Sequence, residues 1–394
     1  MIKLLHSADL HPNAAGTLAG KTILDPATGQ NITLTDLKKS LEFVTSLALD
    51  TDTRCDAVLM PGDLFDGPRP HPNEVRVIRE AVVRLAKQIP VICCAGNHDV
   101  STNARDASAL ECLKDLSNVY VFDRPGTVSL TFAGQRVQFF CLPYPRKSQL
   151  LVHDEHKDKS PEALTAIVNQ ALAATIRGFR AEFEPSLPHV LLAHGSVANC
   201  KVNDQPRSLA TDILLPLAEM AAFDFVALGH IHQRQTLDET ETIWYSGSLM
   251  RNGFGEEKEP KGFNLISLER CEPARVAFVH NPYASVYRTV TALDLDDAFL
   301  AAPLDPSIVW RFKDQLAPAD EQRLRPGLDR LHAETPFFQL NVELLTEDRA
   351  RDAGMADCLT QEEALTRALI GNIDPDDLPA ILAKHHALVA EVGR

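Results

Sequence analysis

The sequence predicts a layered α/β fold, followed by a small α+β module and a helical tail. Three observations predict it. Short apolar runs end repeatedly in polar loops that carry glycine or histidine, helical patterns lie between several of these runs, and a second set of strand and helix patterns begins near Tyr283. Apolar runs of this length are typical of strands buried on both faces, and their alternation with helices is typical of layered α/β domains.

The first part of the chain contains the larger set of elements. Its apolar runs predict buried strands at residues 2–8, 57–60, 91–95, 190–193 and 225–228. Its helical patterns predict helices at residues 34–49, 74–87 and 161–179. The segment 127–142 predicts a hairpin, because Ala133-Gly134-Gln135 supplies a turn at its middle.

The second part begins after the strand-rich stretch 244–279. Its patterns predict strands at 286–292, 308–313 and 337–345 and a helix at 320–334. Two amphipathic patterns occupy the tail, and their apolar faces suit either the coiled coil of a partner or packing on their own domain. We therefore expect three units, at residues 1–282, 283–346 and 347–394.

Composition narrows the class of protein. The 394 residues are 45% hydrophobic, which is enough for two or more packed units. No run is long enough to span a bilayer, and the N-terminus turns polar too early for a secretory signal. The eight cysteines are scattered without a CxxC pair, as is typical of reduced thiols. These features predict a cytoplasmic protein without membrane contact.

The formal net charge of −15 bears on nucleic-acid binding. A negative molecule has no overall field that attracts phosphate, which argues against indiscriminate binding to DNA. Local cations such as Arg69, Arg76, Arg79 and Arg251 could still contact a phosphate, or they could belong to solvated helix surfaces. The sequence leaves that choice open.

Five polar clusters each follow a predicted buried strand. In chain order they are Asp9-Leu10-His11, Gly62-Asp63, Gly96-Asn97-His98-Asp99, His194-Gly195 and Gly229-His230-Ile231-His232. Ligands of layered α/β folds gather at the carboxyl ends of strands, so these loops are expected to converge on one crevice. One such cluster is common in any sequence, but five in order are not expected by chance.

The clusters supply carboxylates, imidazoles and an amide oxygen, but no thiolate. This set suits manganese, iron or zinc in a reactive site rather than structural zinc, and it is large enough for two ions. Asp63 could bridge two cations, and paired cations about 3.5–4 Å apart can clamp both oxygens that exchange in phosphoryl transfer. His98 is the candidate for a catalytic group that does not bind metal, and Asp99 could hold its imidazole in one orientation. The pattern predicts hydrolysis of a phosphoester.

These blocks resemble the signature motifs of the calcineurin-like metallophosphoesterases over residues 1 to about 280. The resemblance implies a β-sandwich flanked by helices and two divalent metal ions, with Mn²⁺ the expected ion. Carried over by motif, it implies two ligand sets: Asp9, His11, Asp63 and His232 for one ion, and Asp63, Asn97, His194 and His230 for the other. His98 falls on the catalytic histidine of the family.

Three further stretches resemble the SbcD-type DNA nucleases within this family. They are the run 62–66 with prolines after it, the run 245–249 followed by Gly255-Glu256-Glu257 and Lys261-Gly262-Phe263, and the module after Tyr283, which resembles a capping domain. This resemblance implies a nuclease acting on DNA as a homodimer, with an SbcC-like coiled-coil ATPase as its partner. Residues 16–35 depart from the resemblance, because they are rich in glycine and threonine where those nucleases carry an Arg-rich loop.

Two other functions stay open at this point. A small-molecule phosphodiesterase or a protein phosphatase could use the same metal core, although neither would require the module after Tyr283. A catalytically silent scaffold could keep the fold for binding alone. The intact candidate ligands and His98 argue against the scaffold.

Overall fold

The computed structural model describes most of the chain. The described residues are 1–13, 24–25, 29–101, 103, 106–146, 159–202, 205–206, 213–269, 272–316, 320–335, 337–344, 381–382 and 384. Much of the segment 16–35 and almost all of the tail 347–394 lie outside them, so what we expect of both stays a prediction. The contacts define two units, residues 1–312 with 327–340 and residues 313–326 with 341–394.

Two six-stranded sheets form the centre of the first unit. In spatial order, the first sheet consists of β16 (Arg275–His280), β15 (Gly262–Leu268), β1 (Ile2–His6), β2 (Ala57–Pro61), β3 (Val91–Cys94) and β4 (Val119–Phe122). Strands β1 to β4 pair in parallel, and β15 and β16 pair antiparallel at the other side. The carboxyl ends of β1, β2 and β3 therefore lie at one edge of this sheet.

The second sheet is also mixed. Its spatial order is β13 (Gln235–Thr236), β14 (Ile243–Tyr245), β12 (Phe225–Gly229), β7 (His189–His194), β6 (Gln135–Leu142) and β5 (Gly126–Phe132). Strands β6, β7, β12 and β14 pair in parallel. The hairpin predicted at 127–142 is confirmed as β5 and β6, and its turn residues Ala133 and Gly134 both have positive φ, as a tight two-residue turn requires.

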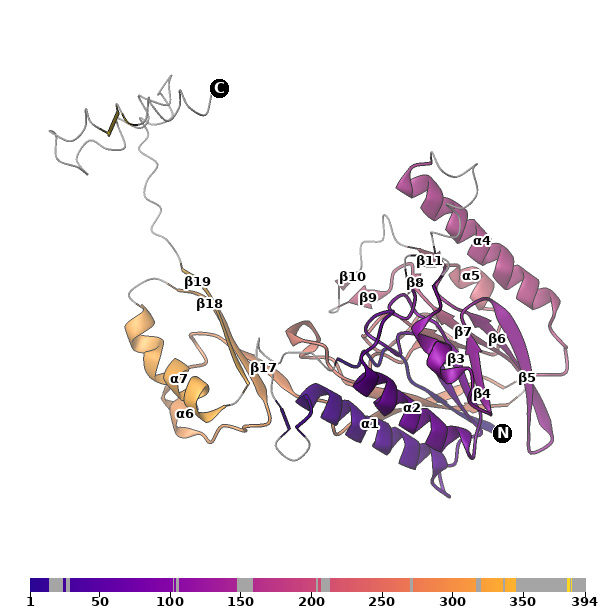
Figure 1. Ribbon diagram of the computed structural model, residues 1–394, viewed down its shortest axis with the longest axis horizontal. Helices are drawn as coiled ribbons and strands as arrows, with labels where there is room; N and C mark the ends of the chain where they lie inside the picture. The colour runs from indigo at the N-terminus through magenta and orange to yellow at the C-terminus, as the bar shows by residue number, and fades with distance from the viewer. Residues whose placement is uncertain are drawn as a thin grey trace. The chain divides into compact units, whose positions relative to one another are not determined.

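The two sheets pack face to face, and helices cover their outer faces (Figure 1). Leu4 and Leu59 of the first sheet and Leu192 and Ala227 of the second point into the core between the sheets, where all are fully buried. The alternate side chains pack under helices, which explains why these strands are apolar along their whole length. The helices are α1 (Ile32–Leu49) and α2 (Pro72–Ala86) on the first sheet and α4 (Pro161–Ala181) on the second. The predicted sandwich flanked by helices is confirmed.

Helices α1 and α2 each begin two residues before the start predicted from the sequence. Asn31 caps α1 by accepting the N–H of Thr33 at 3.0 Å. The cap of α2 is His71, whose ring accepts the N–H of Asn73 while Glu74 accepts the N–H of His71. Histidine is an unusual capping residue, so the start of α2 carries only a weak sequence signal.

A third sheet follows β16 in the chain. It contains β17 (Tyr287–Val290), β18 (Val309–Leu316) and β19 (Phe338–Leu344), with α6 (Asp297–Ala301) and α7 (Asp320–Glu334) between them. The three strands and the longer helix match the predicted elements, whereas α6 was not predicted. The boundary expected at residue 283 falls between β16 and β17 and stays a prediction.

The remaining elements are short. They are η1 (Ala109–Leu113), β8 (Ser196–Val197), β9 (Lys201–Val202), β10 (Gln205–Pro206), β11 (Leu214–Leu215), α5 (Leu217–Met220) and η3 (Phe254–Glu256). Within the described part of the chain, no helix combines the length and the apolar character that a membrane crossing requires.

His6 lies at the end of β1, between the two sheets. Its Nε2 atom donates to the carbonyl oxygen of Leu228 on β12, 3.0 Å away, and its ring meets Phe225 edge to face. The Nδ1 atom is buried, and no described residue forms a hydrogen bond with it. Because burial disfavours the charged ring, the pKa of His6 falls from 6.5 to about 3, and the imidazole stays neutral in the folded protein.

We expect His6 to make the folded protein sensitive to acid. The unfolded chain protonates this ring below pH 6.5, whereas the folded chain resists protonation down to about pH 3, so the free energy of unfolding should fall by up to about 1.4 kcal/mol per pH unit between these values. Urea unfolding of the metal-free wild type and of His6→Gln over this pH range measures the effect. The wild type should lose stability more steeply, and parallel profiles for the two proteins would contradict the prediction.

Candidate metal centre and active site

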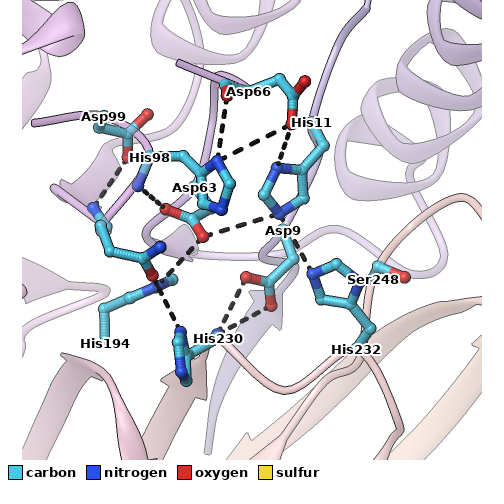
Figure 2. A network of polar contacts seen from close by, with 12 residues as sticks. Asp9, His11, Asp63, Asp66, His98, Asp99, His194, His230, His232 and Ser248 are labelled. Carbon is cyan, nitrogen blue, oxygen red and sulfur yellow. Dashed lines mark hydrogen bonds and ion pairs between the residues drawn. The ribbon is translucent and has the colours of Figure 1, made fainter. Parts of the chain in front are cut away.

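The predicted clusters meet at one edge of the sandwich (Figure 2). Asp9, Asp63 and Asn97 follow β1, β2 and β3 of the first sheet, and His194 and His230 lie at the ends of β7 and β12 of the second. Neighbouring strands in each set run parallel, so their carboxyl ends come together. Residues more than two hundred positions apart thus form one site.

Hydrogen bonds between the two sheets fix these loops. The N–H of His230 donates to both carboxylate oxygens of Asp9, at 2.9 and 3.1 Å. The Nδ1 atom of His194 lies 2.8 Å from the carbonyl oxygen of Pro61. A carbonyl only accepts, so Nδ1 carries the hydrogen, and in the neutral ring Nε2 of His194 presents a lone pair to the site. The geometry therefore depends on both sheets being in place.

Asp9, His11 and His232 form a first group, in which one ligand atom of each lies within 4.8 Å of the others. The Nε2 atoms of His11 and His232 are 3.2 Å apart. In each ring Nδ1 faces a carboxylate, Asp66 for His11 and Glu256 for His232, so Nδ1 donates and Nε2 is left as the acceptor. Two lone pairs at this distance repel each other unless a proton or a metal cation lies between them.

A second group consists of Asp63, His194 and His230, and one ligand atom of each again lies within 4.8 Å of the others. The Oδ1 atom of Asn97 completes it, at 3.0 Å from Nε2 of His194 and 2.9 Å from Nδ1 of His230. The Oδ2 atom of Asp63 lies 3.3 Å from Nε2 of His194 and 3.6 Å from Nε2 of His11. Asp63 therefore faces both groups.

The donor set fits two divalent cations. It contains carboxylate oxygens, imidazole nitrogens and one amide oxygen, which are ligands suited to manganese, iron or zinc in a reactive site. The opposed Nε2 atoms of His11 and His232 are an arrangement that a cation would stabilise. The residues brought together match the ligand sets implied by the sequence motifs, although the role of each as a ligand stays a prediction.

The backbone at the site adopts unusual conformations. Asp9, His11, Asp63 and His230 have positive φ angles of 54°, 40°, 51° and 104°, a region that residues other than glycine rarely occupy. Gly96 leaves space for one of these residues, because a Cβ atom there would lie 2.1 Å from Oδ1 of Asp63. Close approach of the loops thus explains that glycine.

Burial and mutual charge set the protonation of the site. Burial raises the pKa of Asp9. Burial also opposes ionisation of Asp63, but the neighbouring rings, above all His194, hold the pKa of Asp63 below its usual range. Burial lowers the pKa of His194, but Asp63 and Asp9 outweigh it and raise the value to about 9. Without metal, the pocket therefore draws positive charge onto an imidazole, as expected of a site built for cations.

Asp99 does not act as the sequence suggested. Both of its oxygens face backbone N–H groups, of Gly96 at 2.8 Å, Phe65 at 2.9 Å and Leu64 at 3.3 Å. The expectation that Asp99 orients the imidazole of His98 is wrong, because Asp99 accepts from these backbone groups while Nδ1 of His98 contacts the carbonyl oxygen of Asp66. Burial and the charge of Asp63 raise the pKa of Asp99 to about 6. Asp99 instead holds the loop after β2 against the loop after β3.

Asp66 holds the ring of His98, a role that sequence reasoning missed. The Nδ1 atom of His98 lies 3.0 Å from the carbonyl oxygen of Asp66 and 3.9 Å from its Oδ1 atom, and the same carboxylate contacts Nδ1 of His11 at 3.2 Å (Figure 2). Asp66 belongs to the run 62–66 that resembles SbcD-type nucleases, so a signal existed, but nothing in the run shows which ring the residue contacts.

Glu256 is a second residue that the sequence did not assign. Its Oε1 atom accepts from Nδ1 of His232 at 2.7 Å, and its Oε2 atom pairs with the buried Lys261 at 2.8 Å. Burial opposes ionisation of Glu256, but His232 and Lys261 lower its pKa to about 2. Lys261 is 2% exposed and also pairs with Glu259 at 2.7 Å. Glu256 thus fixes the orientation of His232 and directs the Nε2 lone pair into the first group.

We expect Glu256→Gln to weaken metal binding by about 10- to 100-fold, because carboxylates that orient metal-binding histidines contribute this much to affinity. Equilibrium dialysis with Mn²⁺, followed by elemental analysis, measures the change without reference to activity. The exposed Glu239→Gln is the matched control and should bind metal as the wild type does. Equal affinities for all three proteins would show that Glu256 does not support a ligand.

Three comparisons relate the chain to known proteins. The sequence profile of the calcineurin-like phosphoesterases matches residues 2–234. The SbcD component of the SbcCD nuclease of Staphylococcus epidermidis is 25% identical over 282 residues, which cover 71% of this chain and 69% of the relative. Among solved structures, the phosphopantetheinyl hydrolase of Mycobacterium tuberculosis aligns at 15% identity with a TM-score of 0.33, covering 62% of this chain and 86% of that chain.

The profile match extends over more than half of the sequence and contains all nine residues predicted for the site. The fold, the two groups of ligand-type side chains and the profile point to the same conclusion. The chain belongs to the calcineurin-like phosphoesterases, a superfamily of metal-dependent hydrolases.

Proposed function

We propose that the protein is a metal-dependent DNA nuclease similar to SbcD that hydrolyses phosphodiester bonds. The observation that carries this proposal is a cleft of about 410 Å³ whose lining includes His11, His98 and His232. The cleft extends to Ser285 and Tyr287, beyond the predicted boundary of the capping module. A small substrate does not require this second wall, whereas a polynucleotide can use it. The relative named as a nuclease component supports the same substrate class.

The two ligand groups and His98 have different chemical roles in this proposal. Two divalent ions, expected to be Mn²⁺, would be held by the two ligand groups and, when bound, would polarise the phosphoryl group and activate water. The carbonyl oxygen of Asp66 accepts from Nδ1 of His98, so a ring that also carries a proton on Nε2 could give that second proton to the departing oxygen and return to the neutral form. The side chain of His98 is 43% exposed at the cleft, so a substrate can reach it.

Two of the four arginines named from the sequence, Arg79 and Arg251, make contacts within the protein. Arg79 pairs with both oxygens of Asp115 at 2.7 Å. Arg251 donates to the carbonyl oxygens of Glu259 at 2.8 Å and Ser285 at 3.0 Å. Both guanidinium groups are therefore engaged in structural contacts. Their engagement supports a division in which a partner subunit neutralises most of the DNA phosphate.

The proposal includes partners. We assign a homodimer that works with an SbcC-like coiled-coil ATPase on DNA in the cytoplasm, with the tail 347–394 as the segment that binds the ATPase. The name of the relative, one of the components of SbcCD, supports a complex of two kinds of subunit. Free thiols such as those of Cys55, Cys93 and Cys141 suit a reducing compartment.

Digestion of linear DNA tests the proposal. Wild type and His98→Ala are compared with Mn²⁺ or Mg²⁺, with and without the ATPase subunit, and a cyclic nucleotide serves as the small substrate. The nuclease hypothesis predicts that wild type cuts DNA and that His98→Ala does not. Hydrolysis of the cyclic nucleotide without cleavage of DNA would instead identify a small-molecule phosphodiesterase, and metal-loaded protein without any turnover would identify a scaffold.

A further inference from the structure

A second cavity, of about 620 Å³, lies beside the active-site cleft. Its lining includes Gln233, Phe254, Glu257, Lys258, Thr289 and Arg311. A volume of this size is in the range of about 300–1,000 Å³ that holds small ligands. None of the roles described so far uses this cavity.

The cavity and the cleft share a wall. Gln233 lines the cavity and directly follows His232, which lines the cleft. The ring of Phe254, on the cavity side, packs edge to face against Tyr287, on the cleft side, with 4.9 Å between ring centroids. A chain molecule with one phosphate in the cleft can therefore place a neighbouring unit in the cavity.

Arg311 forms a flat cationic surface in this cavity. Its guanidinium carbon lies 4.3 Å from the centroid of Phe254, and its Nη2 and Nε atoms donate to Oγ1 of Thr289 at 2.9 and 3.3 Å. Thr289 is fixed in turn by Glu257, which accepts its N–H at 2.9 Å and its hydroxyl at 2.6 Å. The guanidinium is thus held before any ligand arrives, which lowers the entropic cost of stacking on it.

The remaining charges of the lining suit a nucleotide. Glu259 is paired with the buried Lys261 at 2.7 Å, and the carboxylate of Glu257 already accepts two hydrogen bonds from Thr289. Lys258 lies at the cavity lining and is exposed. A planar guanidinium is a common stacking partner for unpaired bases, and an accessible lysine can contact the phosphate that follows such a base.

We propose that this cavity binds one unpaired nucleobase of the substrate strand, stacked on Arg311, and thereby positions the adjacent phosphodiester in the cleft. The inference rests on the proposed nuclease function and adds a subsite to it. The base leaves the helical stack to enter the cavity, so the subsite favours single strands or frayed ends over intact duplex.

Kinetics on single-stranded oligonucleotides test this proposal. One set of oligonucleotides carries a single abasic site at successive positions, and bis(p-nitrophenyl) phosphate serves as a diester without bases. For the wild type, loss of the base at one position should raise KM about tenfold, the effect expected for one stacked base. In Arg311→Ala and in Arg311→Lys, which keeps the charge but not the plane, the same abasic site should have no further effect. KM for the small diester should not change.

A control variant and two possible results distinguish failure of the subsite from failure of the nuclease function. Arg288→Ala removes a neighbouring cation that lies over Trp310, outside the cavity lining, and should behave as the wild type does at every position. If the wild type cuts DNA but Arg311→Ala keeps the same abasic profile, the subsite is disproved and the nuclease proposal stands. If the wild type hydrolyses only the small diester, both fail.

Discussion

Replacing Asp63 with asparagine is expected to lower kcat/KM for a phosphodiester by more than about 10³-fold and to reduce the metal content of the protein. Asp63 is the carboxylate that faces both ligand groups, with Oδ2 at 3.3 Å from His194 and 3.6 Å from His11. Removing a residue that only orients a ligand costs about 10- to 100-fold, so losing a carboxylate that faces both ligand groups should cost more. Asparagine keeps the size of the side chain and can still accept the N–H of His98.

Elemental analysis and steady-state hydrolysis of bis(p-nitrophenyl) phosphate measure both parts of this prediction. Asp56→Asn is the matched control, because Asp56 precedes the same strand at its opposite end and its side chain accepts the N–H of Lys3. This variant should keep its metal and its activity. An Asp63→Asn protein with two bound ions and more than about a tenth of the wild-type rate would remove the basis for a shared metal ligand.

Replacing His98 with alanine is expected to lower kcat by about 10²- to 10⁴-fold while leaving the metal content and the stability unchanged. The ring lies at the surface of the cleft beside Asp66 and His11, and it is not a member of either ligand group that Asp63 faces. The loss should be larger for DNA than for bis(p-nitrophenyl) phosphate. A nitrophenolate leaves without a proton, whereas a sugar oxygen needs one, so a missing proton donor affects DNA more.

The exposed His280→Ala serves as the control for His98→Ala and should be indistinguishable from the wild type. Two results would reassign His98. A parallel loss of metal would make it a ligand, and an equal loss of rate on both substrates would make it a binding residue rather than a proton donor.

The elements that carry the site could be predicted because burial on both faces makes their strands apolar along the whole length. Strands such as β2 and β12 are apolar at every position, since one face packs on the opposite sheet and the other on helices. Polar residues then begin where each strand ends, as at Asp63 and His230. Parallel pairing brings these ends to one edge, so the order of the clusters along the chain was enough to predict a pocket.

The contacts inside the pocket could not be predicted in the same way. Asp66, Asp99 and Glu256 are carboxylates within a few residues of a glycine, and their sequence surroundings look alike. One contacts two imidazoles, one accepts three backbone N–H groups, and one lies between His232 and Lys261. Which contact each makes depends on loop conformation and on segments far away in the chain, and neither is encoded by local spacing.

The left-handed backbone at Asp9, His11, Asp63 and His230 bears on whether such a protein could persist without its chemistry. Each such residue costs the fold about 1–3 kcal/mol, and glycine in its place would relieve most of that cost. A protein that kept the sandwich only for binding would become more stable if these four residues were replaced by glycine. The presence of these residues in an unfavourable backbone conformation favours an active enzyme over a catalytically silent protein.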